Sequence, residues 1–324
     1  MNHLVLIACA YNLIQPLIKA VSHNHITNNI LTQASLTNCF ILDASKKTNS
    51  SDAVTRTVTI NGIPSIIKQI IHESLDEQFL LINDYLASNI GCSMRIHVNH
   101  VSLIPATINH PAKIFPERAA TIHTIVPGKD IETVRPDFLP EWFMIQQRIC
   151  DPNSPWQKKW PLSENEQGLA KMAIQSMNLH PDLPALIALD TFLGNSDRSY
   201  PNTFYDGISN HFYGIDQAAA FHTPLAQHAC NRIKELMETH YFKQCTPDIL
   251  KSLKMYRDTL KQLYIAYRPK DITQAMHIIA NYVTTKHNLA SNEILENRIQ
   301  AHRKIIEENY TAIKQLIDLI DEVV

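Results

Sequence analysis

The chain has no excess of positive charge. Its 324 residues include 29 Lys and Arg against 31 Asp and Glu, which gives a formal net charge of −2. Proteins that bind nucleic acid neutralise phosphates with clustered Lys and Arg, so this balance argues against a nucleic-acid partner. With 45% hydrophobic and 19% charged residues, the composition is that of an ordinary folded protein.

The six cysteines and sixteen histidines form none of the common metal or disulfide motifs. The cysteines are scattered and include no CxxC pair, which is typical of reduced and mostly buried thiols. No HExxH is present. The histidine pairs 23/25 and 97/100 are interpreted as loop or surface residues and not as a metal site.

Long hydrophobic runs are also missing near the start. The apolar run at residues 4–10 is too short to cross a bilayer. No basic segment precedes it and Pro16 interrupts its continuation, so we expect no cleavable signal peptide. The apolar end at Val323 and Val324 leaves open a longer parent protein, and any membrane contact is expected only through domains outside this chain.

Glycine is scarce, yet three of the seven glycines fall within residues 186–221. This stretch is predicted to contain a helix end (186–193), a polar loop (194–201) and two strands (203–205 and 211–215). An Asp-Gly turn at residues 206–207 between runs of aromatic and β-branched residues is a good hairpin signal. The hairpin brings Asp197 and Asn202, which precede it, towards Asp216, which follows it.

Phosphoryl transfer from ATP needs this set of side chains. One carboxylate orients the attacking hydroxyl, while an amide oxygen and a second carboxylate hold the magnesium ions that neutralise the phosphates. The alternative is a hairpin whose Asp and Asn residues only form turns.

The run NSDR at residues 195–198, followed by Asn202 and by GID at 214–216, resembles the catalytic and metal-binding loops of atypical kinases. The similarity is to HipA-type and phosphatidylinositol-kinase-like kinases, in particular to effector kinases that intracellular bacteria such as Legionella secrete. It implies that Asp197 is the catalytic aspartate, Asn202 a metal ligand and Asp216 the counterpart of the Asp in the D-F-G motif. Gln217 and Ala218 replace the Phe and Gly of that motif. Arg198 would contact substrate or phosphate, or form a salt bridge within the loop.

An early sheet is predicted from strands at residues 39–42, 54–60 and 64–71, the last two joined by an Asn61-Gly62 turn. Lys68 lies among isoleucines, where an ammonium is costly unless an anion meets it. The resemblance implies that Lys68 contacts the α- and β-phosphates of ATP. The alternative is a lysine that extends from an edge strand into solvent.

A helix is predicted over residues 75–89, with Ser74 as its N-cap. The resemblance implies that an acidic residue on this helix pairs with the strand lysine and assists catalysis. Glu77 is the preferred partner and Glu73 the alternative. A capping box formed with Ser74 would by itself explain Glu77.

Two further strands are predicted at residues 96–104 and 117–126, before a crossing at Pro127-Gly128. The resemblance implies that the backbone of His123, Thr124 and Ile125 binds adenine. A glycine-rich loop is missing. Residues 43–52, with Lys46 and Lys47, either cover the phosphates in its place or form a solvated loop.

From residue 129 onward the pattern is mainly helical, with helices expected at 225–242, 247–267, 271–286 and 291–322. We therefore predict an α+β, two-lobed, protein-kinase-like fold. Residues 1–127 would form the amino-terminal lobe and residues 128–324 a helical lobe with the catalytic loops.

The expected activity is phosphoryl transfer to a hydroxyl that depends on ATP and on Mg²⁺ or Mn²⁺. A protein Ser/Thr kinase is preferred over a phosphoinositide kinase, because residues 217–225 contain no Lys or Arg for a lipid headgroup. A pseudokinase scaffold is the third alternative.

The resemblance implies a bacterial protein secreted into a host cell, or otherwise a cytoplasmic one. Scattered basic residues would suit inositol hexakisphosphate as an activator, or are simply solvated. They are Lys46, Lys47, Arg118, Lys129, Arg135, Lys158, Lys159, Arg232 and Lys234.

Overall fold

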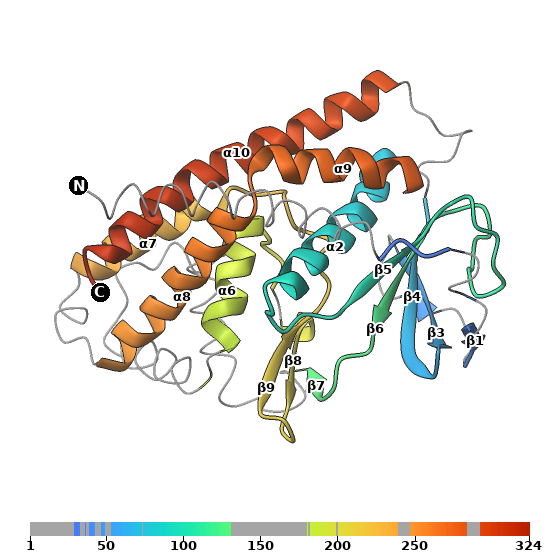
Figure 1. Cartoon of the computed structure of the whole chain (residues 1–324), viewed down its shortest axis with the longest axis horizontal. Helices are drawn as coiled ribbons and strands as arrows, with labels where there is room; N and C mark the ends of the chain where they lie inside the picture. The colour runs from blue at the N-terminus through green and yellow to red at the C-terminus, as the bar shows by residue number, and fades with distance from the viewer. Residues whose placement is uncertain are drawn as a thin grey trace, which may run out of the picture.

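The chain folds into a small antiparallel sheet followed by a helical lobe (Figure 1). The computed structural model describes residues 29–32, 36, 39–42, 47–48, 53–72, 74–130, 180, 182–198, 200–238, 247–283 and 292–324. The arrangement confirms the predicted α+β fold, with a small antiparallel sheet followed by a mainly helical lobe. Residues 131–179, part of the stretch predicted to be mainly helical, lie outside the described residues.

The first sheet has the strand order β1-β3-β4-β6-β5, with the short β2 also paired to β3. Its strands are β1 (Cys39–Ile41), β2 (Lys47–Thr48), β3 (Ala53–Ile60), β4 (Ile63–Ile70), β5 (Val101–Ile104) and β6 (Ala120–Thr124). The predicted Asn61-Gly62 turn joins β3 to β4, with φ of 51° and 79° at its two residues. The predicted strands at 96–104 and 117–126 are both present but shorter.

The two faces of this sheet pack against different parts of the protein. Val58, Ile67 and Ile122 point to one face and form a separate small core. Lys68 and Ile70 alternate onto the other face, which α2 (Leu75–Ser93) covers. Within α2, Ser74 accepts a hydrogen bond from the Glu77 backbone N–H at 3.3 Å, so the predicted N-cap is confirmed. The strand alternation therefore aims Lys68 towards α2 and the helical lobe.

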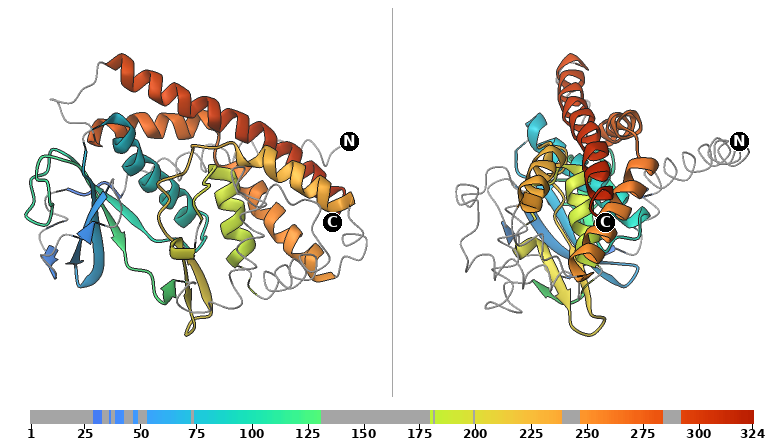
Figure 2. Two further views of the ribbon diagram at one scale, coloured as in Figure 1. Left: turned by 180° about the vertical axis from the view of Figure 1, so that it is seen from behind. Right: turned by 90° about the vertical axis from the view of Figure 1, so that its left-hand side faces the viewer.

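The helical lobe contains α6 (Asp182–Leu193), α7 (Leu225–Glu238), α8 (Pro247–Ala266), α9 (Pro269–Val283) and α10 (Asn292–Asp321). The long α10 runs along α7, α8 and α9, and α9 also contacts α2 (Figure 1). The views in Figure 2 show α2 lying between the first sheet and the helices of this lobe. One apolar core joins α2 to the helical lobe. Among the described helices, none combines the length and apolar character needed to span a membrane.

A second, three-stranded sheet carries the predicted hairpin. Its strands are β7 (Lys129–Asp130), β8 (Thr203–Asp206) and β9 (His211–Gly214). The turn is longer than the predicted Asp-Gly pair and comprises residues 207–210, because the Asp206 carboxylate accepts hydrogen bonds from Ile208 and Ser209. The carboxylate thereby stabilises a wider loop.

The chain passes from the first sheet to the second between Thr124 and Lys129. Gly128 has φ of +90°, and a Cβ there would lie 2.2 Å from the Tyr205 carbonyl oxygen. Only glycine fits this close approach of two backbones. The crossing lies where the lobe boundary at residue 127 was predicted, and the boundary itself stays a prediction.

Candidate active site

Lys68 joins the two parts of the fold. Its ammonium lies 2.8 Å from Asp216 Oδ1, beyond the end of β9, and 3.6 Å from Asp84 Oδ2 on α2. Burial lowers the pKa of Lys68, but the Asp84 and Asp216 carboxylates more than offset this and raise it above its ordinary value. Lys68 therefore stays charged and presents its ammonium beside Asp216.

The acidic partner of Lys68 on α2 is Asp84, so the prediction of Glu77 for this role needs correction. Glu77 makes no described ion pair with Lys68, and Glu73 lies outside the described residues. Asp84 is fully buried and lies seven positions, or two helical turns, beyond Glu77. Both are on the same helical face, but only the turn that carries Asp84 lies level with Lys68. Glu77 instead belongs to the first turn and its N-cap.

Asp216 has a backbone φ of +52°, which is uncommon for a residue other than glycine. Burial disfavours its charged form, but Lys68, through its charge and its hydrogen bond, holds the pKa of Asp216 below the ordinary value. Asp216 is therefore an ionised carboxylate at neutral pH. Its strained conformation aims that carboxylate at the lysine of the other lobe.

Asp197 and Asn202 form the other half of the predicted group. The Asn202 side-chain amide donates to the Asp197 carbonyl at 2.9 Å and to Asp197 Oδ2 at 3.2 Å. Partial desolvation, followed by the negative charge of Asp216, raises the pKa of Asp197. An exposed carboxylate with a raised pKa suits the role of accepting a proton from a substrate hydroxyl.

The predicted metal ligands have the right chemistry for magnesium. Because the Asn202 amide nitrogen donates to Asp197, its oxygen is the atom left for a metal, and Asp216 supplies a carboxylate. The Asn202 backbone carbonyl accepts from Ile215 N–H at 3.0 Å, which holds the two ligand-bearing segments together. Hard oxygen donors of this kind, completed by phosphate oxygens and water, are what Mg²⁺ prefers.

Arg198 is buried and organises the loop from inside. Its guanidinium donates to both Asp190 oxygens, at 3.0 and 2.9 Å, and to the carbonyls of Asn202 and Ile215, at 2.7 and 2.8 Å. Of the two alternatives for Arg198, the structure therefore shows the salt bridge within the loop. The planar, five-donor group fixes the segments before Asp197 and Asp216 relative to each other.

Gln217, the residue after Asp216, links three elements. Its backbone N–H donates to Asp84 Oδ1 at 3.0 Å. Its side-chain oxygen accepts from Arg198 at 2.8 Å and from Asn195 at 2.9 Å. Gln217 is fully buried and forms a polar bridge from α2 to the loop that carries Asn195 and Arg198.

His123 contributes its side chain to this network. Asn99 Nδ2 donates to His123 Nδ1 at 2.9 Å, which places the ring proton on Nε2. Nε2 then donates to Thr121 Oγ1 at 2.9 Å and lies 3.5 Å from Asp84 Oδ2. Burial lowers the pKa of His123, so the ring is neutral at pH 7.

Two of the backbone N–H groups that were predicted to contact adenine already donate hydrogen bonds within the protein. The Thr124 and Ile125 N–H groups donate to the carbonyls of His100 and Pro64, at 3.0 and 3.3 Å. Those two donors therefore serve the first sheet, and adenine binding by residues 123–125 stays a prediction that depends on their carbonyl groups.

The predicted phosphate-covering segment is described only in part. Lys47 is paired with Thr55, which is itself paired with Lys68, so Lys47 and Lys68 share one register position across β2, β3 and β4. Lys46 lies outside the described residues.

Sequence reasoning missed Asp84 and Asp190. Both are acidic residues inside otherwise apolar helical runs, and both are completely buried. That pattern is the signal that could have found them, because a buried carboxylate needs a cationic or hydrogen-bonding partner.

No protein-family model matches the chain, and no curated protein matches it. Among solved structures, it is similar to the crystal structure of a Helicobacter pylori proinflammatory kinase, CtkA. The identity is 14% and the TM-score 0.44, and the similarity covers 89% of this chain and 96% of that chain.

Proposed function

We propose that the protein transfers the γ-phosphoryl group of ATP to a hydroxyl of a protein substrate. The observation that carries the proposal is the 2.8 Å contact between Lys68 of the first sheet and Asp216 after the hairpin, with Asp197 and Asn202 beside it. Phosphoryl transfer depends on positioning and charge neutralisation, for which an ammonium and three oxygen-bearing side chains suffice.

Each residue has a defined task in this proposal. Lys68 binds the α- and β-phosphates and is held by Asp84. Asp197 orients the acceptor hydroxyl and takes its proton. Asn202 and Asp216 would hold Mg²⁺ or Mn²⁺, which neutralises charge on the phosphates when bound.

A protein acceptor is preferred because the segment after Asp216 lacks basic residues. Residues 217–225 contain no Lys or Arg. An anionic lipid headgroup would call for cationic side chains there. A phosphoinositide kinase is the alternative, and a secreted bacterial effector is the biological setting we propose for the protein kinase.

The test is transfer of radiolabelled phosphate from ATP by the purified chain with Mg²⁺ or Mn²⁺. Autophosphorylation and labelling of a basic protein substrate are measured beside phosphoinositide vesicles. Asp197→Ala and Asp216→Ala should each lower transfer by at least about 100-fold. Asp318→Ala is the matched control, because Asp318 is an exposed aspartate paired with Lys314 on α10.

The outcomes separate the alternatives. Labelled lipid without labelled protein would favour the phosphoinositide kinase. ATP binding without transfer to any acceptor would favour the scaffold. The same assays, repeated with inositol hexakisphosphate, test whether this polyanion activates the protein. Among the described basic residues considered for binding it, Arg118 already donates hydrogen bonds to the carbonyls of Ile70 and Ile71.

A further inference from the structure

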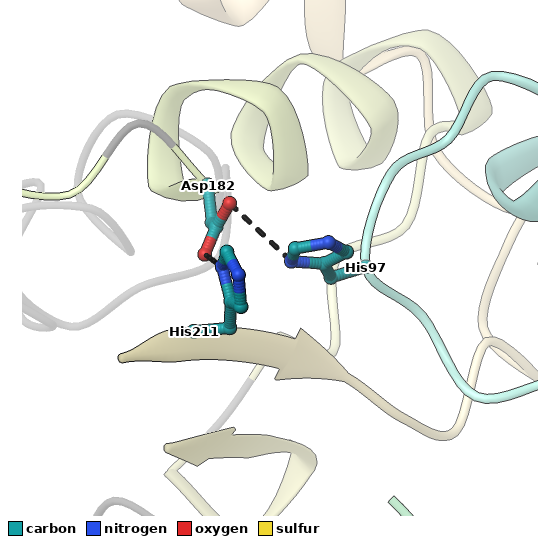
Figure 3. Close-up of side chains that lie close together, drawn as sticks. All are labelled: His97, Asp182 and His211. Carbon is teal, nitrogen blue, oxygen red and sulfur yellow. Dashed lines mark hydrogen bonds and ion pairs between the residues drawn. The ribbon is translucent and has the colours of Figure 1, made fainter. Parts of the chain in front are cut away.

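A second cluster of ionisable side chains lies away from Lys68, at the other end of the hairpin. His97 lies between α2 and β5, Asp182 is the first residue of α6, and His211 is the first residue of β9. Figure 3 shows both imidazole rings directed at the Asp182 carboxylate. His97 Nδ1 lies 3.3 Å from Asp182 Oδ1, and His211 Nδ1 lies 2.9 Å from Asp182 Oδ2.

These side chains have the types and spacing of a transition-metal site. One ligand atom from each of the three residues lies within 4.8 Å of the others. A tetrahedral site with bonds of about 2.0–2.1 Å has ligand atoms about 3.3 Å apart, so small side-chain movements bring all three into coordination. Two imidazoles and a carboxylate suit Zn²⁺, with water as the fourth ligand.

The hydrogen bonds within this cluster leave ligand atoms of Asp182 and His97 available for a metal ion. Asp182 Oδ2 accepts from the Phe212 backbone N–H at 3.1 Å as well as facing His211. Oδ1 faces His97, whose Nδ1 is buried without a hydrogen-bond partner in the described part of the chain. An imidazole nitrogen that is directed at a carboxylate oxygen but makes no hydrogen bond is suited to a shared metal ion.

The surroundings fix the ring positions. The His97 ring stacks on Tyr213, with centroids 5.2 Å apart, and meets the His211 ring edge-on at 4.3 Å. The side chains of His97 and His211 are 34% and 42% exposed, so the cluster lies close to the surface. The site is therefore held in shape before any ion enters it.

We propose that His97, Asp182 and His211 bind one Zn²⁺ ion that fastens the segment between α2 and β5 to α6 and the hairpin. The same segments already share backbone bonds, from Gly214 N–H to the His97 carbonyl at 2.9 Å and from Asn99 N–H to the Gly214 carbonyl at 3.0 Å. Gly214 precedes Asp216 by two residues, so the ion stabilises the hairpin that carries the candidate catalytic carboxylate. The zinc site does not depend on the proposed kinase activity.

The alternative is a metal-free cluster in which both histidines donate hydrogen bonds to Asp182. Zinc titration distinguishes the two. The chain is first stripped with a chelator, and ZnCl₂ is then added while heat release and melting temperature are recorded. His97→Ala is the sharpest variant, because it removes a ligand without breaking a hydrogen bond. His277→Ala is the matched control, because His277 is also a half-buried histidine beside a carboxylate, 3.4 Å from Glu296.

The wild-type chain and His277→Ala should bind one Zn²⁺ per chain, with a rise in Tm of about 5 °C when zinc exceeds its Kd 100-fold. His97→Ala and His211→Ala should each weaken binding by about tenfold or more. With Co²⁺ as the probe, visible absorption without a thiolate charge-transfer band would confirm nitrogen and oxygen ligands. Unchanged zinc affinity in both variants, thiolate bands with Co²⁺, or no Tm shift of the wild-type chain would overturn the proposal.

Discussion

Lys68 Nζ and Asp216 Oδ1 meet at 2.8 Å although 148 positions separate the two residues in the chain. The contact joins a strand of the first sheet to the segment that leaves the hairpin, and Asp84 on α2 lies beneath it at 3.6 Å from the ammonium. The Lys68 ammonium therefore links β4, α2 and the segment after β9. Substitution of its carboxylate partners should lower stability and activity together.

Asp84→Ala should lower the free energy of unfolding by about 3 kcal/mol, because it removes one partner of a buried ion pair. It also removes the acceptor for the Gln217 backbone N–H. Urea denaturation measures the loss of stability, and phosphate transfer should fall by at least about tenfold with it.

Glu77→Gln is the control for Asp84→Ala on the same helical face. Glu77 is in the first turn of α2, where a negative charge contributes at most about 1 kcal/mol through the helix dipole. Equal losses from the two substitutions would contradict the assignment of Asp84 as the partner of Lys68.

Arg198→Lys should destabilise the candidate catalytic loop although it keeps the charge. An ammonium cannot reproduce the two bonds to Asp190 together with those to the Asn202 and Ile215 carbonyls, so we expect a loss of about 3 kcal/mol. Arg303→Lys on α10, an exposed pair with Glu307, should change stability by less than about 0.5 kcal/mol. A small effect at Arg198 as well would show that the buried network is not needed.

Gly194→Ala tests the close backbone contact at the start of the candidate catalytic loop. Gly194 has φ of +66°, and a Cβ there would lie 2.1 Å from the Thr223 carbonyl oxygen. Gly62 also has a positive φ but nothing within 4 Å, so Gly62→Ala should cost only about 1 kcal/mol of backbone strain. Thermal unfolding should show a clearly larger loss for Gly194→Ala, and similar losses would contradict the close approach.

His302 should make the protein less stable in mild acid. Burial beside Phe79 lowers the pKa of His302 from 6.5 to about 4. Below pH 6.5 the unfolded chain binds a proton that the folded chain excludes, so the free energy of unfolding falls as the pH drops from 6.5 towards 4. At about 1.4 kcal/mol per pKa unit, the loss from this residue is about 3 kcal/mol.

His302→Phe keeps the ring stacking and removes the titrating group. Its stability should therefore fall about 3 kcal/mol less than that of the wild type between pH 7 and pH 4, as measured by urea denaturation at each pH. His123, whose pKa is also lowered, titrates in the same direction and remains in both proteins. Parallel stability curves for the two proteins would rule out His302 as the source.

The elements of the fold were largely predictable from local pattern. The Asn61-Gly62 turn predicted the first hairpin, Ser74 marked the start of α2, and the helical pattern at residues 291–322 predicted α10. Asp197, Asn202 and Asp216 could be grouped because a hairpin connects them within twenty positions.

The partners of Lys68 and of His97 could not be predicted in the same way. Choosing Asp84 over Glu77 requires knowing which turn of α2 lies level with Lys68, and this depends on how the helix packs against the sheet. The two histidines meet at Asp182 only because β9 lies beside the segment before β5. Which of the local candidates become partners depends on packing between distant segments, and local sequence pattern does not determine it.

The most direct test of the account is an experimental structure of the chain with Mg²⁺ and a non-hydrolysable ATP analogue. The account predicts Lys68 Nζ within hydrogen-bonding distance of an α- or β-phosphate oxygen, and Mg²⁺ bound by Asn202 and Asp216. It also predicts the Asp197 carboxylate facing the γ-phosphate. Nucleotide bound elsewhere, or a triphosphate without contact to Lys68 and Asp216, would contradict it.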